Sequence, residues 1–574
     1  MRTTPSTSIS IMRDLALKRA VGVFLFLGLG ALAVVARLFQ IQIVEHRHWA
    51  QLAQRIQEEV VEVPARRGSI LDRNGIALAY DVPAYDIALD NFHMTKPELL
   101  VDLLVDLLGM EPSEAASKVY REGYFTWIAR RVERSLGEEL RRKAQEMDIR
   151  GLLFFDTWKR AYPQGYQAID LLGVVGVDGE GLEGLEYRFD RDLKGKPQRL
   201  RLVRGRDGVV YELWVEDAGE KGTDLQLTLD ARIQEICAQS LDWGLGHFRA
   251  RRGLAVVLDP RTGEILALAQ APRWSPKGED PALLHPWAIT DPFEPGSTFK
   301  ALVGTAALEE GVVHPDDLFS GNSPYMVDGV PIANAAQHSY GTVTFARGII
   351  QSINTVLIQV ALRLGKERTY EYLRRFGIGE RTGIELPGES PGKLDPPEKW
   401  TRVRLATISF GQGVAVTGVQ LARAFAAIAN DGLLPQLHLL AGKSPSPKRI
   451  LSPQACATMR RILRDAVAMP GGTGHHTEVP GFGVAGKSGT AQKAVPGKGY
   501  SQEKIMGAMA AFFPWDAPEY VILVVYDEPS WPRPTWGGNT AGPTVARIIR
   551  EMAASGLIHP FPRFLNTETS SYNR

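Results

Sequence analysis

The chain has 574 residues, which exceeds one compact core and predicts about three structural units of roughly 100–200 residues each. Its 66 lysine and arginine residues nearly balance its 65 aspartate and glutamate residues, so no overall charge favours nucleic acid or another strongly charged partner. The cysteines, Cys237 and Cys456, are too few for a disulfide framework or a cysteine-rich metal site, and both are predicted to be buried.

An uncharged apolar run covers residues 20–36 and continues beyond Arg37 to residue 44. This length predicts a transmembrane helix at 20–44. Residues 1–19 carry more positive than negative charge, with Arg2, Arg13, Lys18 and Arg19 but only Asp14. Because positive charge stays on the cytoplasmic side of a membrane, this segment is expected in the cytoplasm. The bulk of the chain is then expected on the extracytoplasmic, periplasmic side of the inner membrane. The alternative is a cleaved signal peptide, because Ala31-Leu32-Ala33 matches a cleavage pattern, although it lies within the apolar run.

Three further patterns follow the apolar run. Residues 49–62 have apolar side chains at helical spacing and predict an amphipathic helix. Residues 67–79 predict a β-hairpin, with Asn74-Gly75 as its turn. Residues 96–149 are predicted to be helical, with leucines on one face and a solvated, charge-rich face from 130 to 143.

Residues 151–222 are rich in strand-forming residues and glycines. Two strings in this stretch, 160–165 and 181–186, contain no obvious nucleophile, so they are predicted to be scaffold turns with buried ion pairs. A strand at 224–230 and a helix at 233–245 are expected to open a second, larger domain.

The C-terminal third contains three strand candidates, at 484–494, 505–513 and 520–526. Their short connections favour an antiparallel sheet. A helix at 543–554, with its proline in the first turn, is predicted to close the domain. The tail beyond residue 561 is polar and is expected to fray.

Three short strings carry the candidate chemistry: Ser297-Thr298-Phe299-Lys300, Ser352-Ile353-Asn354 and Lys487-Ser488-Gly489-Thr490. Pro295-Gly296 can start a helix at Ser297, which places Lys300 one turn on, on the same face. A lysine can activate a serine only when its amine is unprotonated, and burial, the helix dipole and a nearby Lys487 would each lower the pKa of Lys300. Alone, this Ser-x-x-Lys pattern is more typical of a surface helix turn.

The other two strings would complete such a site. A break in the helical stretch around Ser352 would turn Ser352 and Asn354 into a cleft, where Ser352 passes a proton and Asn354 fixes a substrate amide. The alternative is a polar interruption without a ligand. On a strand, Lys487 and Gly489 share one face while Ser488 and Thr490 share the other. The backbone N–H groups of Ser297 and Thr490 are then the expected oxyanion-hole donors.

Three other groups of residues are candidates for a function. His475 and His476 are adjacent, point apart and have no third ligand at suitable spacing, so we expect no metal and no cofactor. Glu294 and Asp291 could be general bases, but bracing of the helix start is favoured. The aromatic and proline-rich run 531–536 predicts a rigid loop that could rim a substrate cleft.

In this order and spacing, the three strings resemble the penicillin-recognising serine acyltransferases, whose third string holds a substrate carboxylate through its lysine and hydroxyls. Further residues resemble the pedestal motifs of class B penicillin-binding proteins: Arg67, Gly68, Asp72, Arg73, Asn74, Gly75, Arg160, Tyr162, Pro163, Gly165, Gly184 and Glu186. Gly537-Gly538 with Ala541 and Pro543 fits their C-terminal pattern. The string 293–297 and the moderate length resemble the division-septum type. Ile353 and Ser488 depart from the more frequent serine and threonine, which affects expected substrate preference more than mechanism.

The resemblance implies a multidomain chain. Its expected parts are a cytoplasmic tail (1–19), a transmembrane helix (20–44), a non-catalytic, dimerisation-like α+β pedestal domain (45–222), an α/β transpeptidase domain with an antiparallel sheet flanked by helices (223–556), and a C-terminal tail (557–574).

The resemblance also implies an activity. Ser297 would attack the carbonyl between the two terminal D-alanines of a peptidoglycan stem peptide, release D-alanine, and pass the acyl group to an amine of a neighbouring stem. Beta-lactams mimic that terminus and would stay on Ser297. The expected role is septal wall synthesis during cell division. The alternatives are a sidewall-elongation transpeptidase, a beta-lactamase or penicillin sensor, and a noncatalytic wall-assembly scaffold.

The expected partners follow from the same resemblance. They are the stem peptide of nascent glycan derived from lipid II, and an integral-membrane glycosyltransferase of the division or, alternatively, the elongation machinery. Contact with the glycosyltransferase is predicted through the span and residues 67–79, because nothing in this chain resembles a glycan polymerase.

Overall fold

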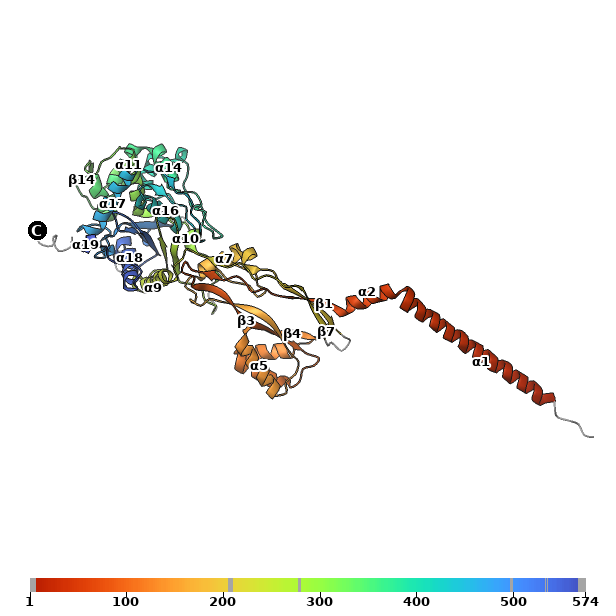
Figure 1. The fold of residues 1–574 in the computed structure, drawn as a ribbon. Coiled ribbons are helices and arrows are strands. Elements are labelled where there is room, and N and C mark those ends of the chain that lie inside the picture. Colours follow the sequence, from red (N-terminus) through yellow and green to blue (C-terminus); the bar gives the residue numbers. More distant parts are fainter. Residues whose placement is uncertain are drawn as a thin grey trace, which may run out of the picture. The chain divides into compact units, whose positions relative to one another are not determined.

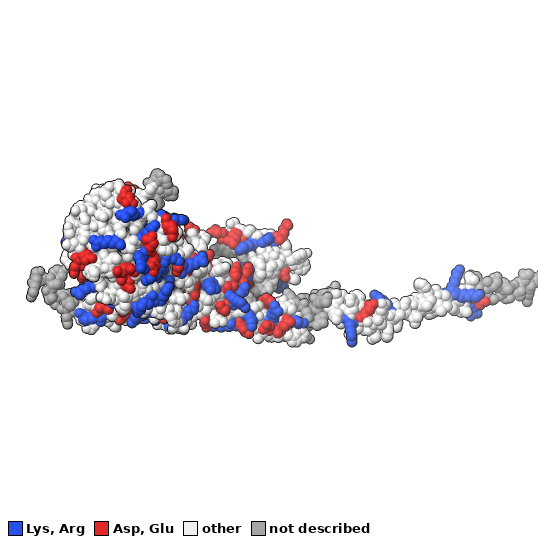
Figure 2. Space-filling view, turned by 90° about the horizontal axis from the view of Figure 1, so that it is seen from above, with Lys and Arg blue, Asp and Glu red and all other residues white. Residues whose placement is uncertain are grey.

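The computed structural model describes residues 7–204, 210–276, 280–495, 499–531, 533 and 535–565 (Figure 1). The chain divides into two compact units, Met1–Ala65 with Lys196–Glu220, and Arg66–Gly195 with Lys221–Arg574. On the face seen in Figure 2, basic and acidic side chains are interspersed, as the nearly balanced composition leads one to expect.

The first unit contains one long apolar helix. α1 (Thr7–Phe39) continues through a π-helical turn (Gln40–Val44), and α2 (His46–Gln57) follows. The stretch Arg13–Val44 has a mean hydropathy of 2.3 and is long and apolar enough to cross a membrane. This agrees with the predicted span.

The predicted helix over 49–62 is wrong in its last turn. α2 ends at Gln57, and Glu58–Val63 forms β1, which pairs antiparallel with β6 (Gln198–Arg204); β6 in turn pairs with β7 (Val210–Asp217). Valines at three of the six positions of β1 favour a strand once a partner is present, and that partner lies far along the chain.

The second unit begins with the pedestal sheet. Its long strand is β3 (Ala77–Asp90), which pairs antiparallel with β2 (Ile70–Leu71), β4 (Phe125–Glu133) and β5 (Leu152–Ala161), while β8 (Leu225–Gln226) joins β2 in parallel. The β2–β3 pair is the predicted hairpin, and Gly75 in its turn has φ +81°, a conformation that favours glycine. The predicted strand at 224–230 is shorter than expected, because it is limited to β8.

Helices cover one face of this sheet (Figure 1): α3 (Pro97–Leu108), α4 (Pro112–Val119) and α5 (Arg134–Glu146). The prediction of helix throughout 96–149 is wrong at β4. There, buried Thr126 and Ile128 alternate with exposed Phe125 and Trp127, a period of two that suits pairing with β3.

The stretch 151–222 combines strands with short helices that the sequence did not indicate: α6 (Ile169–Leu172), α7 (Gly184–Arg188) and α8 (Asp190–Lys194). Inside the pedestal, Arg67 Nε lies 2.6 Å from Glu186 Oε2 and Arg160 Nε lies 2.7 Å from Glu186 Oε1. Glu186 is fully buried, so the motif residues form an interior ion-pair network, as predicted. The predicted turns are wrong at the two paired residues, because Arg160 lies on β5 and Glu186 lies in α7.

The expected transpeptidase domain is built on a five-stranded antiparallel sheet in the order β10-β9-β19-β18-β17. Its strands are β9 (Arg252–Leu258), β10 (Ile265–Ala271), β17 (Ala485–Val495), β18 (Gly499–Phe513) and β19 (Tyr520–Asp527). The predicted antiparallel arrangement of the last three is therefore confirmed.

Alternate residues of this sheet enter two hydrophobic cores. On one face α9 (Ala231–Phe248) and α18 (Gly537–Ala554) pack together, and Cys237 is buried there. The core on the other face holds Cys456 and a group of helices. These are α11 (Phe299–Glu309), α12 (Phe345–Ile350), α13 (Asn354–Leu364), α14 (Lys366–Arg375), α15 (Arg402–Ile408), α16 (Gly418–Ala429) and α17 (Pro453–Ala468).

Short elements complete this domain. α10 (Trp287–Thr290) precedes the string Ser297-Thr298-Phe299-Lys300, and three two-stranded pairs lie outside the main sheet. The pairs are β11 (Leu318–Ser320) with β14 (Thr342–Thr344), β12 (Tyr325–Val327) with β13 (Val330–Ile332), and β15 (Leu433–Leu434) with β16 (Lys448–Arg449).

The C-terminal helix begins earlier than predicted. α18 starts at Gly537, so Pro543 lies inside the helix and not in its first turn. The reason is close packing, since a Cβ atom on Gly537 would lie 2.0 Å from the carbonyl oxygen of Gly489. The predicted frayed tail contains one more helical turn, α19 (Pro562–Leu565), and residues 566–574 lie outside the described part of the chain.

Candidate active site

Ser297 lies in a tight turn that leads into α11. Gly296–Thr298 forms a single 3-10 turn, and the hydroxyl of Thr298 donates a 2.7 Å hydrogen bond to the carbonyl of Pro295. Gly296 has φ +56°, and a Cβ atom there would lie 2.5 Å from the carbonyl oxygen of Thr490. The half-buried Ser297 is therefore placed at a helix start, as the Pro295-Gly296 pattern predicts. The fold also brings this turn directly beside β17.

Lys300 is fully buried and points its amine at the second string. Nζ donates hydrogen bonds to the carbonyl of Ser352 (2.6 Å), to the Ser352 hydroxyl (3.1 Å) and to Oδ1 of Asn354 (2.6 Å). Within the described chain, no ion pair joins Lys300 to a carboxylate. Burial, and after it the charge of Lys487, hold the pKa of Lys300 well below its usual range.

The second string lies in the predicted helix break, between α12 and α13. Ser352 has φ +58°, a left-handed conformation that turns the chain between the two helices, while Ile353 is buried behind it. Asn354 begins α13, and its Nδ2 donates to the carbonyl of Ala333 at 2.9 Å. The amide is thus held at both ends, by Lys300 and by Ala333.

Lys487 occupies the buried face of β17. Its Nζ donates to the Thr473 hydroxyl (3.3 Å) and to the carbonyl of Ser488 (3.1 Å), and burial lowers its pKa to about 7. Thr473 was not predicted as a site residue. It lies in the turn after α17, and only the fold brings it to Lys487.

The rest of the third string is fixed by contacts within the protein. A Cβ atom on Gly489 would lie 2.7 Å from both the carbonyl oxygen of Pro295 and Cγ2 of Thr298. Glycine is therefore needed here for the turn at 294–298, named the nucleophile turn after the role expected of Ser297, to approach β17. The Thr490 hydroxyl accepts a 3.0 Å hydrogen bond from the N–H of Gly537 at the start of α18. Ser488 is buried next to them.

The acidic residues before Ser297 have structural partners. Oε1 of Glu294 accepts hydrogen bonds from the N–H of Gly413 (2.8 Å) and from the hydroxyl of Tyr500 (3.0 Å). Asp291 forms a 2.6 Å ion pair with Arg252. These contacts support the bracing role that the sequence favours. In the aromatic run 531–536, two of the six residues lie outside the described chain, and Trp536 is the N-cap of α18.

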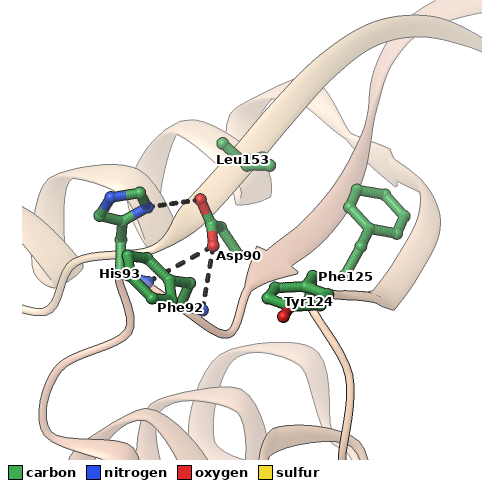
Figure 3. Close-up of a pocket in the computed structure, with 6 residues that line it drawn as sticks. All are labelled: Asp90, Phe92, His93, Tyr124, Phe125 and Leu153. Carbon is green, nitrogen blue, oxygen red and sulfur yellow. Dashed lines mark hydrogen bonds and ion pairs between the residues drawn. The ribbon is translucent and has the colours of Figure 1, made fainter. Parts of the chain in front are cut away.

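A separate hollow of about 460 Å³ lies on the pedestal and contains none of the three strings (Figure 3). In Figure 3 the aromatic rings of Phe92, Tyr124 and Phe125 surround Asp90, whose carboxylate is 2.7 Å from Nδ1 of His93. Because Asp90 is bound to its own neighbours, this hollow does not compete with the Ser297 region as the catalytic site.

Comparison with known proteins places this chain in a family. Residues 253–550 match the family described as "Penicillin binding protein transpeptidase domain", and residues 62–227 match "Penicillin-binding Protein dimerisation domain". The chain belongs to the class B penicillin-binding proteins, and it is a transpeptidase of that family.

Two curated proteins and one solved structure illustrate the similarity. Stage V sporulation protein D of Bacillus subtilis is 31% identical over 557 residues, which cover 93% of this chain and 85% of that protein. Peptidoglycan D,D-transpeptidase FtsI of Escherichia coli K12 is 30% identical over 512 residues, covering 87% and 85%. The crystal structure of penicillin binding protein 3 from Mycobacterium tuberculosis complexed with aztreonam has a TM-score of 0.68 at 27% identity, and the match covers 88% of this chain and 99% of that chain.

Proposed function

We propose that this transpeptidase crosslinks the stem peptides of peptidoglycan through an acyl-enzyme on Ser297. The Ser297 oxygen attacks the carbonyl between the two terminal D-alanines, a C–O bond forms, and the C–N bond breaks to release D-alanine. An amine of a neighbouring stem then attacks the ester, so that a new C–N bond replaces the bond to Ser297. Support comes from the relative FtsI of Escherichia coli K12, which is named a peptidoglycan D,D-transpeptidase.

The buried, uncompensated amine of Lys300 is the observation that carries this proposal. Lowering the pKa of Lys300 increases the fraction of the amine that is neutral, and the neutral amine can accept the Ser297 proton. The Ser352 hydroxyl, 3.1 Å from Nζ, can then pass that proton to the leaving nitrogen of D-alanine. In the second half-reaction the acceptor amine loses a proton, and one returns to Ser297 by the same route.

The third string supplies binding and charge stabilisation in this proposal. Lys487, with the hydroxyls of Ser488 and Thr490, would hold the terminal carboxylate of the substrate. The N–H groups of Ser297 and Thr490 would stabilise the oxyanion, each contributing about 3 kcal/mol to the transition state. Support comes from the close packing of the Gly296 turn on Thr490, which brings both backbone segments together.

Labelling with a fluorescent penicillin tests the acylation step. We expect a durable label on the full-length chain in detergent and none on Ser297→Ala. Rapid loss of the label would indicate a beta-lactamase, and an unlabelled parent chain would contradict the proposal. Crosslinked muropeptide formed from lipid-linked substrate then separates a transpeptidase from a penicillin sensor or a scaffold.

We further propose a septal role with the N-terminus in the cytoplasm. The string 293–297 supports the septal role, and the positive charge before the apolar helix supports the cytoplasmic N-terminus. The proposed domain bounds are 45–222 for the pedestal and 223–556 for the catalytic domain. A fluorescent fusion that labels the sidewall and not midcell would favour an elongation role instead.

An integral-membrane glycosyltransferase is the proposed partner. Within 67–79, the turn at 73–76 is exposed and could contact it together with the span, whereas Arg67 is buried. Recovery of the glycosyltransferase in a pull-down should fall when both regions are replaced, and unchanged recovery would exclude this mode of contact.

A further inference from the structure

Glu294, which precedes Ser297 by one helical turn of sequence, joins three segments around the nucleophile. One carboxylate oxygen, Oε1, accepts the hydrogen bonds from Gly413 N–H and from the Tyr500 hydroxyl. Gly413 belongs to the loop that follows α15, whereas Tyr500 lies on β18 and pairs with Ala494 of β17. The nucleophile turn, the loop and the β17–β18 hairpin therefore meet at this oxygen.

The loop after α15 also touches the nucleophile turn directly. The N–H of Gly296 donates to the carbonyl of Gly411 at 3.3 Å, and a Cβ atom on Gly411 would lie 2.2 Å from the carbonyl oxygen of Gly296. From the other side, Nη2 of Arg404 donates to the carbonyl of Gly413 at 2.8 Å. The N–H and the carbonyl of Gly413 are thus both hydrogen-bonded, which holds in place the loop that donates to Glu294.

The contact between Glu294 and Tyr500 suits a fixed position and not proton transfer. Burial, and after it the charge of Glu294, raise the pKa of Tyr500 to about 12, so the phenol remains a donor at neutral pH. The second carboxylate oxygen, Oε2, is inaccessible to solvent and has no hydrogen-bond partner among the described residues. Oε1 of Glu294 therefore joins the segments, and Oε2 is closed off from solvent, which favours a structural role for this carboxylate over a catalytic one.

The two N–H groups assigned to the oxyanion hole lie on segments that this contact joins. Ser297 belongs to the nucleophile turn, and Thr490 belongs to β17 in the hairpin that carries Tyr500. Because these segments are distant in sequence, only contacts between them can set the spacing of their N–H groups. We infer that Glu294 and Tyr500 are positioning residues that fix Ser297 against β17 for the tetrahedral intermediate, an inference that rests on the proposed acyl-transfer function.

A positioning role predicts a specific kinetic defect. Tyr500→Phe removes only a hydroxyl, and we expect it to lower the acylation rate constant about 10-fold while the dissociation constant of the first complex changes less than about 2-fold. Glu294→Ala should lower the same rate constant at least about 10-fold. Glu294→Gln keeps an oxygen that can accept both hydrogen bonds, so its rate constant should stay within about 3-fold of the parent.

The experiment measures fluorescent-penicillin acylation of the detergent-solubilised full chain at several drug concentrations, which separates the rate constant from the dissociation constant. Tyr372→Phe is the matched control, since Tyr372 donates a 2.6 Å hydrogen bond to Glu310 at the far end of α11. We expect it to leave both constants unchanged.

Several results would overturn the inference: parent rate constants in Tyr500→Phe and Glu294→Ala, a defect in the dissociation constant alone, or an equal loss in Tyr372→Phe. The inference would also be overturned if Glu294→Gln were acylated as slowly as Glu294→Ala, because the charge of Glu294 and not its hydrogen bonds would then be needed. A parent chain that is not acylated on Ser297 would instead reject the proposed function itself.

Discussion

The amine of Lys300 lies 2.6 Å from Oδ1 of Asn354, so this buried lysine is paired with a neutral amide and not with a carboxylate. A carboxylate in this place would stabilise the ammonium form, whereas the amide leaves burial and Lys487 to depress the pKa of Lys300. The amide therefore leaves the pKa of Lys300 low, which suits the role of base that we propose for this amine.

Asn354→Asp should reverse this effect. A carboxylate at this distance raises the pKa of a lysine by about 1–3 units, so acylation at neutral pH should fall at least about 10-fold and recover as the pH rises. The measurement is the pH dependence of fluorescent-penicillin acylation. Asn354→Ala is the control, because it loses the substrate contact without adding charge and should be slow at every pH. A parent-like profile in Asn354→Asp would show that Lys300 is not the base.

The pH profile of the parent should be bell-shaped. The base must be neutral, so acylation rises as the pH increases through the lowered pKa of Lys300. Lys487 must be a cation to hold a carboxylate, so affinity falls as the pH increases beyond its pKa of about 7. In Lys487→Arg the guanidinium stays charged, and the descending limb should disappear. If that limb persists in Lys487→Arg, another group causes it.

Removal of Glu186 should destabilise the pedestal strongly. Its carboxylate is fully buried between Arg67 and Arg160, and Glu186→Ala leaves two buried guanidinium groups short of a partner, at a cost of about 3–5 kcal/mol in the free energy of unfolding. The urea midpoint of the full chain in detergent, followed by tryptophan fluorescence, measures this cost. Glu146→Ala breaks an exposed pair with Arg142 on α5 and should cost less than about 0.5 kcal/mol. Equal shifts in the two variants would contradict the prediction.

Two substitutions at Ser352 should separate its backbone conformation from its hydroxyl. At φ +58°, glycine is tolerated better than alanine, so Ser352→Gly should be about 1 kcal/mol more stable to unfolding than Ser352→Ala. Both variants lack the hydroxyl and should acylate equally slowly. Recovery of the parent rate in Ser352→Gly would exclude Ser352 as the proton relay.

Patterns that are local in sequence predicted their structures well. The Asn74-Gly75 turn, the helix start at Ser297 and the three C-terminal strands depend on neighbouring residues, and each forms close to the expected place, although β18 begins at Gly499 and not at Ile505. Glu58–Val63 and Phe125–Glu133 become strands because β6 and β3 supply partners that no local window contains. The early start of α18 likewise reflects contact with β17, which the sequence around Pro543 cannot reveal.

The site shows the same division between local and distant information. Lys300 could be proposed from its spacing to Ser297, since one turn of helix sets their relation. Thr473 could not, because its place beside Lys487 depends on where α17 ends against β17. The link from Glu294 to Tyr500 is also invisible in the sequence, although the position of Glu294 just before the nucleophile made it a candidate.

The middle position of β19 in the catalytic sheet has a consequence for biosynthesis. β19 is the last of the five strands to be made, yet it lies between β9 and β18. At synthesis rates of roughly 5–20 residues per second, tens of seconds pass between the synthesis of β9 and the synthesis of β19, its neighbour in the sheet. Until then the β9–β10 and β17–β18 hairpins have open edges that can pair with other chains. A prematurely terminated polypeptide would therefore be prone to aggregate, and the nascent enzyme gains its catalytic surroundings only near the end of its synthesis.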